Sequence, residues 1–150
     1  MKKFVTTMML IGILSVCLHT QVVAQDVVTK KVSELPENAR EMLSKYFPYA
    51  KISYIKVDKD LFLTTSYDVK LSDGTEIDFN SKGDWLEIDC QKEVVPAALI
   101  PESIRKYMEE NFKGQRITEI ERNRKGYQIT LANDLEIKFD PFGTFIKLDL

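Results

Sequence analysis

Two stretches of the chain carry apolar residues at helical spacing. Apolar side chains recur at i, i+3, i+4 and i+7 from Ala39 to Tyr46, and the start of the same stripe returns from Ile104 to Met108. A Pro-Glu pair stands before each stripe, and both residue types are favoured in the first turn of a helix. The pattern therefore predicts amphipathic helices near residues 37–47 and 102–112, with their stripes packed in the core.

After each helix the hydrophobic period changes to two. Tyr67, Val69 and Leu71 alternate with polar residues, and the following Asp73-Gly74 is typical of a hairpin turn. Further alternating segments and turns follow in both halves of the chain. Each half is predicted to form one helix and a four-stranded antiparallel meander.

The two halves are copies of one unit. Leu35-Pro36-Glu37 aligns with Ile100-Pro101-Glu102, and after a shift of five residues Tyr67–Leu71 aligns with Tyr127–Leu131. We expect a first repeat over residues 25–90, a linker over 91–99 and a second repeat over 100–150. The predicted fold class is α+β, with an eight-stranded antiparallel sheet, both helices on one face and the other face open to water.

The N-terminus has the pattern of a cleaved export signal. Residues 1–24 combine two lysines, a short apolar run and a small-residue site that ends at Ala24. Cys17 resembles a lipid-attachment site, but Val16 stands where such a site has a small residue, so cleavage after Ala24 is predicted instead. The mature protein is expected in the periplasm or secreted, with no membrane-spanning segment.

Removal of the signal limits the available chemistry. The only histidine of the chain, His19, leaves with it, and Cys90 becomes the only cysteine. Catalytic sites that depend on histidine are therefore excluded, no intrachain disulfide can form, and a monomer with a buried thiol is expected.

Charge and composition argue against several classes of function. The mature chain keeps 19 basic and 23 acidic residues, since Lys2 and Lys3 leave with the signal. It has no basic cluster for nucleic acid, no glycine loop for phosphate, and no motif for a cofactor or a metal site. Oxygen-bearing turns at 58–60 and 80–84 leave calcium binding as an alternative, and the many carboxylates leave an acid–base enzyme as a weaker one.

The alternation also predicts which side chains face water on the open side of the sheet. From the first repeat these are Asp68, Lys70, Glu76, Asp78, Trp85 and Glu87, and from the second Gln128, Thr130, Glu136, Lys138, Phe145 and Lys147. Trp85 and Phe145 occupy equivalent positions, and two interpretations stay open for them: anchors for a partner, or rings packed against their neighbours. The predicted partner-binding residues are Trp85, Phe145, Glu87 and Lys147.

One motif carries a resemblance to a known family. The segment Tyr46–Lys51 after the helix, followed by Ile77–Glu87 with its Asn-Ser-Lys-Gly-Asp-Trp-Leu-Glu series, resembles the PepSY-like, beta-lactamase-inhibitor-like family of exported Bacteroides-type proteins. The resemblance covers nearly the whole mature chain, although the second copy has Pro141-Phe142 in the turn and Phe145 in place of the tryptophan. It implies a tandem helix-plus-sheet fold with a concave open face, and it implies no catalytic residues. Inhibition of a beta-lactamase does not follow from the fold.

The leading functional prediction is therefore a non-enzymatic exported module. We expect it to bind a protein or peptide of the cell envelope through the open sheet face. A small-ligand or calcium-binding periplasmic protein is the alternative, and a carboxylate enzyme comes third.

Overall fold

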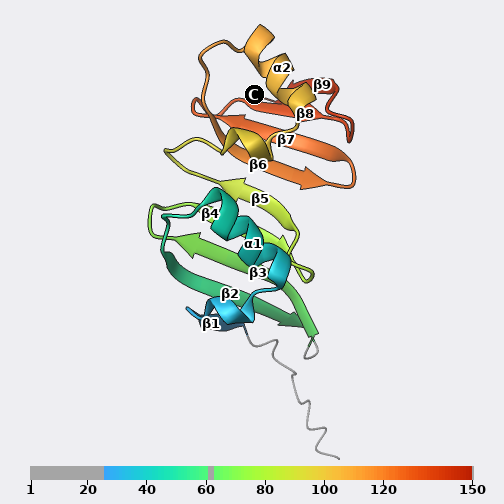
Figure 1. Ribbon diagram of the computed structural model, residues 1–150. Helices are drawn as coiled ribbons and strands as arrows, with labels where there is room; N and C mark the ends of the chain where they lie inside the picture. Colours follow the sequence, from blue (N-terminus) through green and yellow to red (C-terminus); the bar gives the residue numbers. More distant parts are fainter. Residues whose placement is uncertain (1–25, 61–62, 150) are drawn as a thin grey trace, which may run out of the picture.

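The computed structural model describes residues 26–60 and 63–149 of the chain (Figure 1). The predicted export signal, with Cys17 and His19, lies outside the described residues. Over the described part the predicted α+β fold is confirmed, with nine strands instead of the eight that the sequence predicts.

The strands form one antiparallel sheet in which each strand pairs with its neighbours in sequence. In order along the chain and across the sheet, they are β1 (Val27–Thr29), β2 (Ile52–Asp60), β3 (Leu63–Leu71), β4 (Glu76–Asn80), β5 (Trp85–Asp89), β6 (Ile117–Asn123), β7 (Gly126–Leu131), β8 (Glu136–Phe139) and β9 (Phe145–Asp149). The extra strand is β1, whose three residues are too few to produce an alternation that sequence analysis can detect.

Two α-helices of equal length lie on the same face of the sheet. They are α1 (Glu37–Tyr46) and α2 (Glu102–Asn111), and Figure 1 shows α1 in front of the first strands and α2 in front of the last ones. Pro36 and Pro101 occupy the N-cap, one residue before the first helical position at which the sequence placed them. Short 3-10 turns, η1 (Val32–Glu34) and η2 (Ala97–Leu99), precede the two helices.

The turn between the last two strands of each repeat packs against the start of the helix. Gly83 and Gly143 adopt φ values of +83° and +81°, and a Cβ atom on Gly83 would lie 2.8 Å from the Cβ atom of Pro36. In each copy a helix side chain also donates a hydrogen bond to a carbonyl of the turn, from Asn38 in the first and from Ser103 in the second. The glycine allows the close contact that fixes the helix to the sheet.

The core lies between the helices and the sheet. Its fully buried side chains are mainly isoleucines and phenylalanines at alternate strand positions, namely Ile55, Ile77, Phe79, Ile88, Ile120, Ile129, Ile137 and Phe139. The linker contributes as well, because Val95 is buried and its amide donates to the carbonyl of Ile117 on β6. The core is therefore continuous across the boundary between the repeats.

Candidate functional site

The sheet face opposite α1 and α2, here called the open face, is the candidate site. The strand pairings put the predicted polar side chains on it, since Asp68 lies opposite Asp78, and Asp78 opposite Glu87. Across the second repeat Gln128 lies opposite Lys138, which lies opposite Lys147. The predicted facing is therefore confirmed for Glu87 and Lys147.

Carboxylates gather at the centre of this face. One row crosses β3 to β6 and consists of Asp68, Asp78, Glu87 and Glu121, each directly opposite the next. A second row crosses β4 to β6 and consists of Glu76, Asp89 and Glu119. Like charges directly opposite each other destabilise a sheet. Neighbouring carboxylates in these rows therefore repel one another, and a cationic partner would reduce this repulsion.

The pKa values of the central carboxyls reflect this crowding. Burial is the main cause that raises the pKa of Asp78 to about 6, and the nearby charges of Asp68 and Glu76 raise it further. Burial likewise raises the pKa of Glu87 to about 7, with the charges of Glu119 and Asp78 adding to it. At pH 7 Glu87 is therefore only partly ionised.

Lysines flank the carboxylate rows. On one side the ammonium of Lys56 lies 2.7 Å from Asp58, and Lys70 forms an ion pair with Glu76. On the other side the ammonium of Lys138 lies 2.5 Å from Asp149. The open face thus has an acidic centre on β3–β6 between two borders that carry lysines.

A hollow of about 360 Å³ extends over β6 to β9 beside the acidic centre. Its lining includes Glu121, Gln128, Lys138 and Lys147 from the open face, together with Ile146. The hollow and the carboxylate rows share Glu121, so they form one surface.

Trp85 and Phe145 do not lie on the open face, and this prediction was wrong. Trp85 lies opposite Phe79, while Glu87 lies opposite Asp78, so Leu86 is an extra residue that forms a β-bulge. The bulge turns Trp85 to the helix side, where it is 9% exposed. The same register shift occurs between Lys138 and Phe139, and it turns Phe145 to the helix side as well.

Each ring has a partner on the helix side. The guanidinium of Arg122 lies 3.9 Å from the ring centroid of Trp85, and its Nε donates to the Trp85 carbonyl over 2.6 Å. Phe145 stacks on Tyr107 of α2 with centroids 5.0 Å apart. An aromatic residue on the open face is Tyr54, opposite Lys70.

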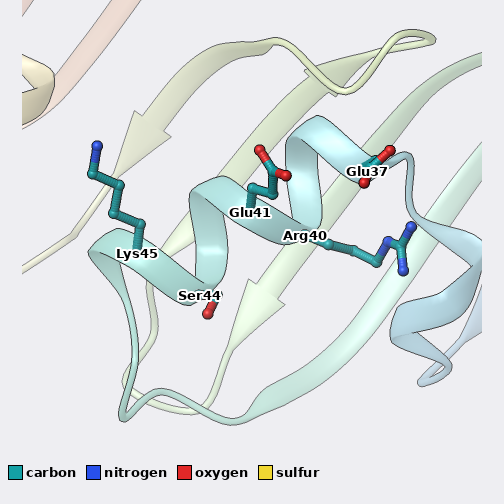
Figure 2. Close-up of a pocket in the computed structure, with 5 residues that line it drawn as sticks. All are labelled: Glu37, Arg40, Glu41, Ser44 and Lys45. Atoms are coloured by element: carbon teal, nitrogen blue, oxygen red, sulfur yellow. The ribbon is translucent and has the colours of Figure 1, made fainter.

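Other depressions lie on the helix side. Figure 2 shows the one on the outer surface of α1, lined by Glu37, Arg40, Glu41, Ser44 and Lys45, whose side chains diverge into solvent. Another, of about 330 Å³, lies between α2 and the linker, and one of about 230 Å³ lies between α1 and β2. Because the side chains around the depression on α1 point away from one another, they could not contact a common ligand.

Of the two segments considered for calcium, residues 58–60 lie in strand β2 and do not form a turn, and the turn at 80–84 is held by its own hydrogen bonds. The side-chain oxygen of Asn80 accepts hydrogen bonds from the amides of Lys82 and Asp84, and the Asn80 amide donates to Asp84. Within residues 26–60 and 63–149 no three metal-ligating side chains gather closely enough to hold an ion.

The sequence did not predict the carboxylate rows as a unit. It placed Glu76, Asp78 and Glu87 on the open face, but the rows are completed by Glu119 and Glu121 of the second repeat. Only the pairing of β5 with β6 brings these residues together. Acidic residues at alternate positions of both strands were the available signal.

Comparisons with known proteins agree with the fold. Residues 65–147 match the family described as "Putative beta-lactamase-inhibitor-like, PepSY-like". No curated protein matches the chain significantly. None of the described helices is long and apolar enough to cross a membrane.

Several solved structures are similar to the chain. A putative periplasmic protein of unknown function from Bacteroides vulgatus is 58% identical, with a TM-score of 0.79 over 83% of this chain and 99% of that one. A putative calcium-regulated periplasmic protein from Bacteroides thetaiotaomicron is 33% identical (TM-score 0.77, 83% and 97% covered). A second putative periplasmic protein from B. vulgatus is 34% identical (TM-score 0.77, 83% and 97% covered). These descriptions agree with the predicted periplasmic location.

Proposed function

The chain belongs to the PepSY-like, beta-lactamase-inhibitor-like family, and from this premise we propose that it is a non-enzymatic periplasmic binding module. Its open face binds a protein or peptide segment that carries lysine or arginine side chains. The observation that carries the proposal is the pair of carboxylate rows at the centre of a sheet face that no described helix covers.

Charge complementarity identifies the chemistry of the partner. A cationic segment laid across β3–β6 would contact both rows and remove the repulsion between neighbouring carboxylates. Because the pKa of Glu87 is raised to about 7, this residue gains charge between pH 6 and pH 8. Binding of a cationic partner is therefore expected to tighten over that range.

Of the partner-binding residues predicted from the sequence, two keep a place in this proposal. Glu87 lies in the first carboxylate row, and Lys147 lines the neighbouring hollow. Trp85 and Phe145 have none, because their rings lie on the opposite face of the sheet. No hollow described above is lined by Asp78 or Glu87, so the raised pKa values of these two carboxyls do not support an acid–base enzyme.

The test is affinity capture with the immobilised mature chain from an envelope extract of its own source. The wild type is compared with the double variant Glu87→Lys/Glu121→Lys, which reverses two charges on the open face. The control is Glu37→Lys/Glu41→Lys, which makes the same change of charge on the outer surface of α1 (Figure 2).

We expect at least one protein to be retained by the wild type and the α1 variant, and to be lost from the open-face variant. Its retention should also weaken as the salt concentration rises. Equal retention by all three proteins, each with a cooperative unfolding transition, would exclude the open face as the binding surface.

Calcium binding is the second candidate function, and similarity to a protein described as calcium-regulated favours it. The open-face carboxylates supply the oxygen atoms that calcium requires, although no three of them gather at one point in the described chain. We expect chelators to leave the melting temperature unchanged. A loss of several degrees on chelation, reversed by added calcium, would support calcium binding instead.

A further inference from the structure

The last strand of the sheet has an outer edge that no described strand covers. Its side chains are unusually apolar for such a position, since Phe145 is 37%, Ile146 54% and Leu148 43% exposed. Phe142, in the turn before β9, is 87% exposed. Natural proteins protect exposed edges with charge, shortness, bulges or cover. β9 is short and has Lys147 and a bulge, but its other exposed side chains are apolar and leave a surface on which another strand can pack.

The internal repeat provides a template for that occupant. The strand equivalent to β9 is β5, which pairs with its inner neighbour in the same register and with the same bulge. The outer edge of β5 is covered by β6, with Glu87 opposite Glu121, Ile88 opposite Ile120 and Asp89 opposite Glu119. The bulge therefore does not prevent strand addition at this edge.

At the other end of the sheet, a short strand covers the outer edge of the repeat. The strand equivalent to β6 in the first repeat is β2, and its outer edge is covered by β1, whose Val28 lies opposite Lys56. The array of strands thus has a short cap at its beginning, and no described counterpart at its end.

We propose that the outer edge of β9 binds an extended segment of another protein as an added antiparallel strand in the register of β6. The occupant has an apolar residue opposite Leu148, facing the helix side, and an acidic residue opposite Lys147, facing the open side. The next residue of the occupant that faces the helix side would correspond to Arg122, which contacts the Trp85 ring and carbonyl in the first repeat. An arginine there would lie beside Phe145, the equivalent of Trp85.

Charge favours this register at β9 more than at β5. In the template, Glu121 lies opposite Glu87, which is a like-charge pair. At β9 the equivalent position is Lys147, whose side chain is 55% exposed and whose ammonium lies 2.6 Å from Asp149. An acidic residue opposite Lys147 would form a cross-strand ion pair where the template has repulsion.

The probe for this proposal is a capped synthetic peptide with the sequence of residues 116–123, Arg-Ile-Thr-Glu-Ile-Glu-Arg-Asn. It is titrated into the isotope-labelled mature chain, and amide shifts and hydrogen exchange are followed by NMR. We expect saturable shifts and slowed exchange at the amides of β9, and none with a scrambled peptide. In Lys147→Glu the dissociation constant should rise about threefold or more, because an attractive cross-strand pair becomes repulsive.

A charge swap separates pairing in this register from nonspecific attraction. A peptide carrying Glu121→Lys should bind Lys147→Glu more tightly than the unmodified peptide does. The proposal is wrong if β9 amides do not respond at millimolar peptide, or if the swap fails to restore binding. Shifts confined to β5 would reveal exchange of β6 instead, and concentration-dependent protection of β9 without peptide would reveal a second copy of this chain. Either result would overturn the proposal, and neither bears on the open face.

Discussion

At the scale of single residues, local register decides what a side chain does in this protein. Trp85 and Glu87 are two positions apart, yet they lie on opposite faces of the sheet because Leu86 is the extra residue of a bulge. As a result Trp85 packs in the core beside Phe79, while Glu87 faces the other carboxylates. Strict alternation would have placed both on the same side.

Truncation of Trp85 should therefore destabilise the fold. We expect Trp85→Ala to lower the free energy of unfolding by about 3–5 kcal/mol, because a buried aromatic leaves a cavity and Arg122 loses its contact. Chemical denaturation measures the loss, and Trp85→Phe, which copies the second repeat, should lose less. Tryptophan fluorescence of the native protein should be blue-shifted and resistant to quenchers, and a red-shifted, readily quenched emission would contradict the burial.

The raised pKa of Glu87 makes stability depend on pH. A carboxyl with a pKa of about 7 in the folded protein, against its ordinary value of 4.5, favours folding when it is protonated. Its contribution is fully present below pH 4.5 and is lost as the pH rises through 7. Asp78, with a pKa of about 6, acts in the same direction.

Glu87→Gln should therefore raise the melting temperature at pH 8 relative to the wild type, and should flatten the decline between pH 5 and pH 8. Differential scanning calorimetry across this range measures both effects. Glu41→Gln on α1 is the matched control and should leave the pH profile as in the wild type. If the melting temperatures of Glu87→Gln and the wild type changed with pH in parallel, the raised pKa of Glu87 would not affect stability.

At the scale of elements, the contact between helix and turn is repeated in both copies. Gly83 and Gly143 stand at equivalent places, and each lies against the first turn of a helix. The helices need this contact, since isolated helices of ten residues are marginal in water. The sheet turn thus helps to hold a helix that would not persist alone.

Gly83→Ala tests this contact. The new Cβ would meet the Pro36 Cβ at 2.8 Å and the Ala39 amide nitrogen at 2.9 Å, in addition to the strain of a φ of +83°. Gly74→Ala is the control, because its φ is +98° and its Cβ would meet nothing within 4 Å. We expect about 1 kcal/mol of destabilisation from strain in the control, and about 1–3 kcal/mol more in Gly83→Ala. Equal losses in urea denaturation would show that the close packing contributes nothing.

At the scale of the whole molecule, pairing of β5 with β6 joins two repeats into one sheet. This pairing unites the carboxylate rows, and the linker residue Val95 is buried beside it. Each repeat alone would expose the edge of β5 or β6 and half of the shared core. Units of this size are marginally stable even when intact.

Residues 25–95 expressed alone should therefore be unfolded or aggregated. Circular dichroism and a thermal scan of the fragment, with the mature chain as the control, measure this. A cooperative unfolding transition in the fragment would instead show that the first repeat, predicted from the sequence to span 25–90, is an independent domain.

The sequence by itself determined the repeat, the two helices, the strand alternation and the family resemblance. The helices and the strand alternation depend on periodicities within about ten residues, which local hydrophobic patterns encode directly. The repeat and the family resemblance are visible because the same residues recur in order along the chain. It also placed Glu87 and Lys147 on the correct face. It could not place Trp85 and Phe145, because a bulge is defined by the partner strand and leaves no mark in the pattern of one strand.

Only the tertiary structure decided that β1 caps the sheet, that Glu119 and Glu121 join the carboxylates of the first repeat, and that the edge of β9 has no described cover. These features arise from contacts between segments far apart in the chain, and local periodicity carries no information about such contacts.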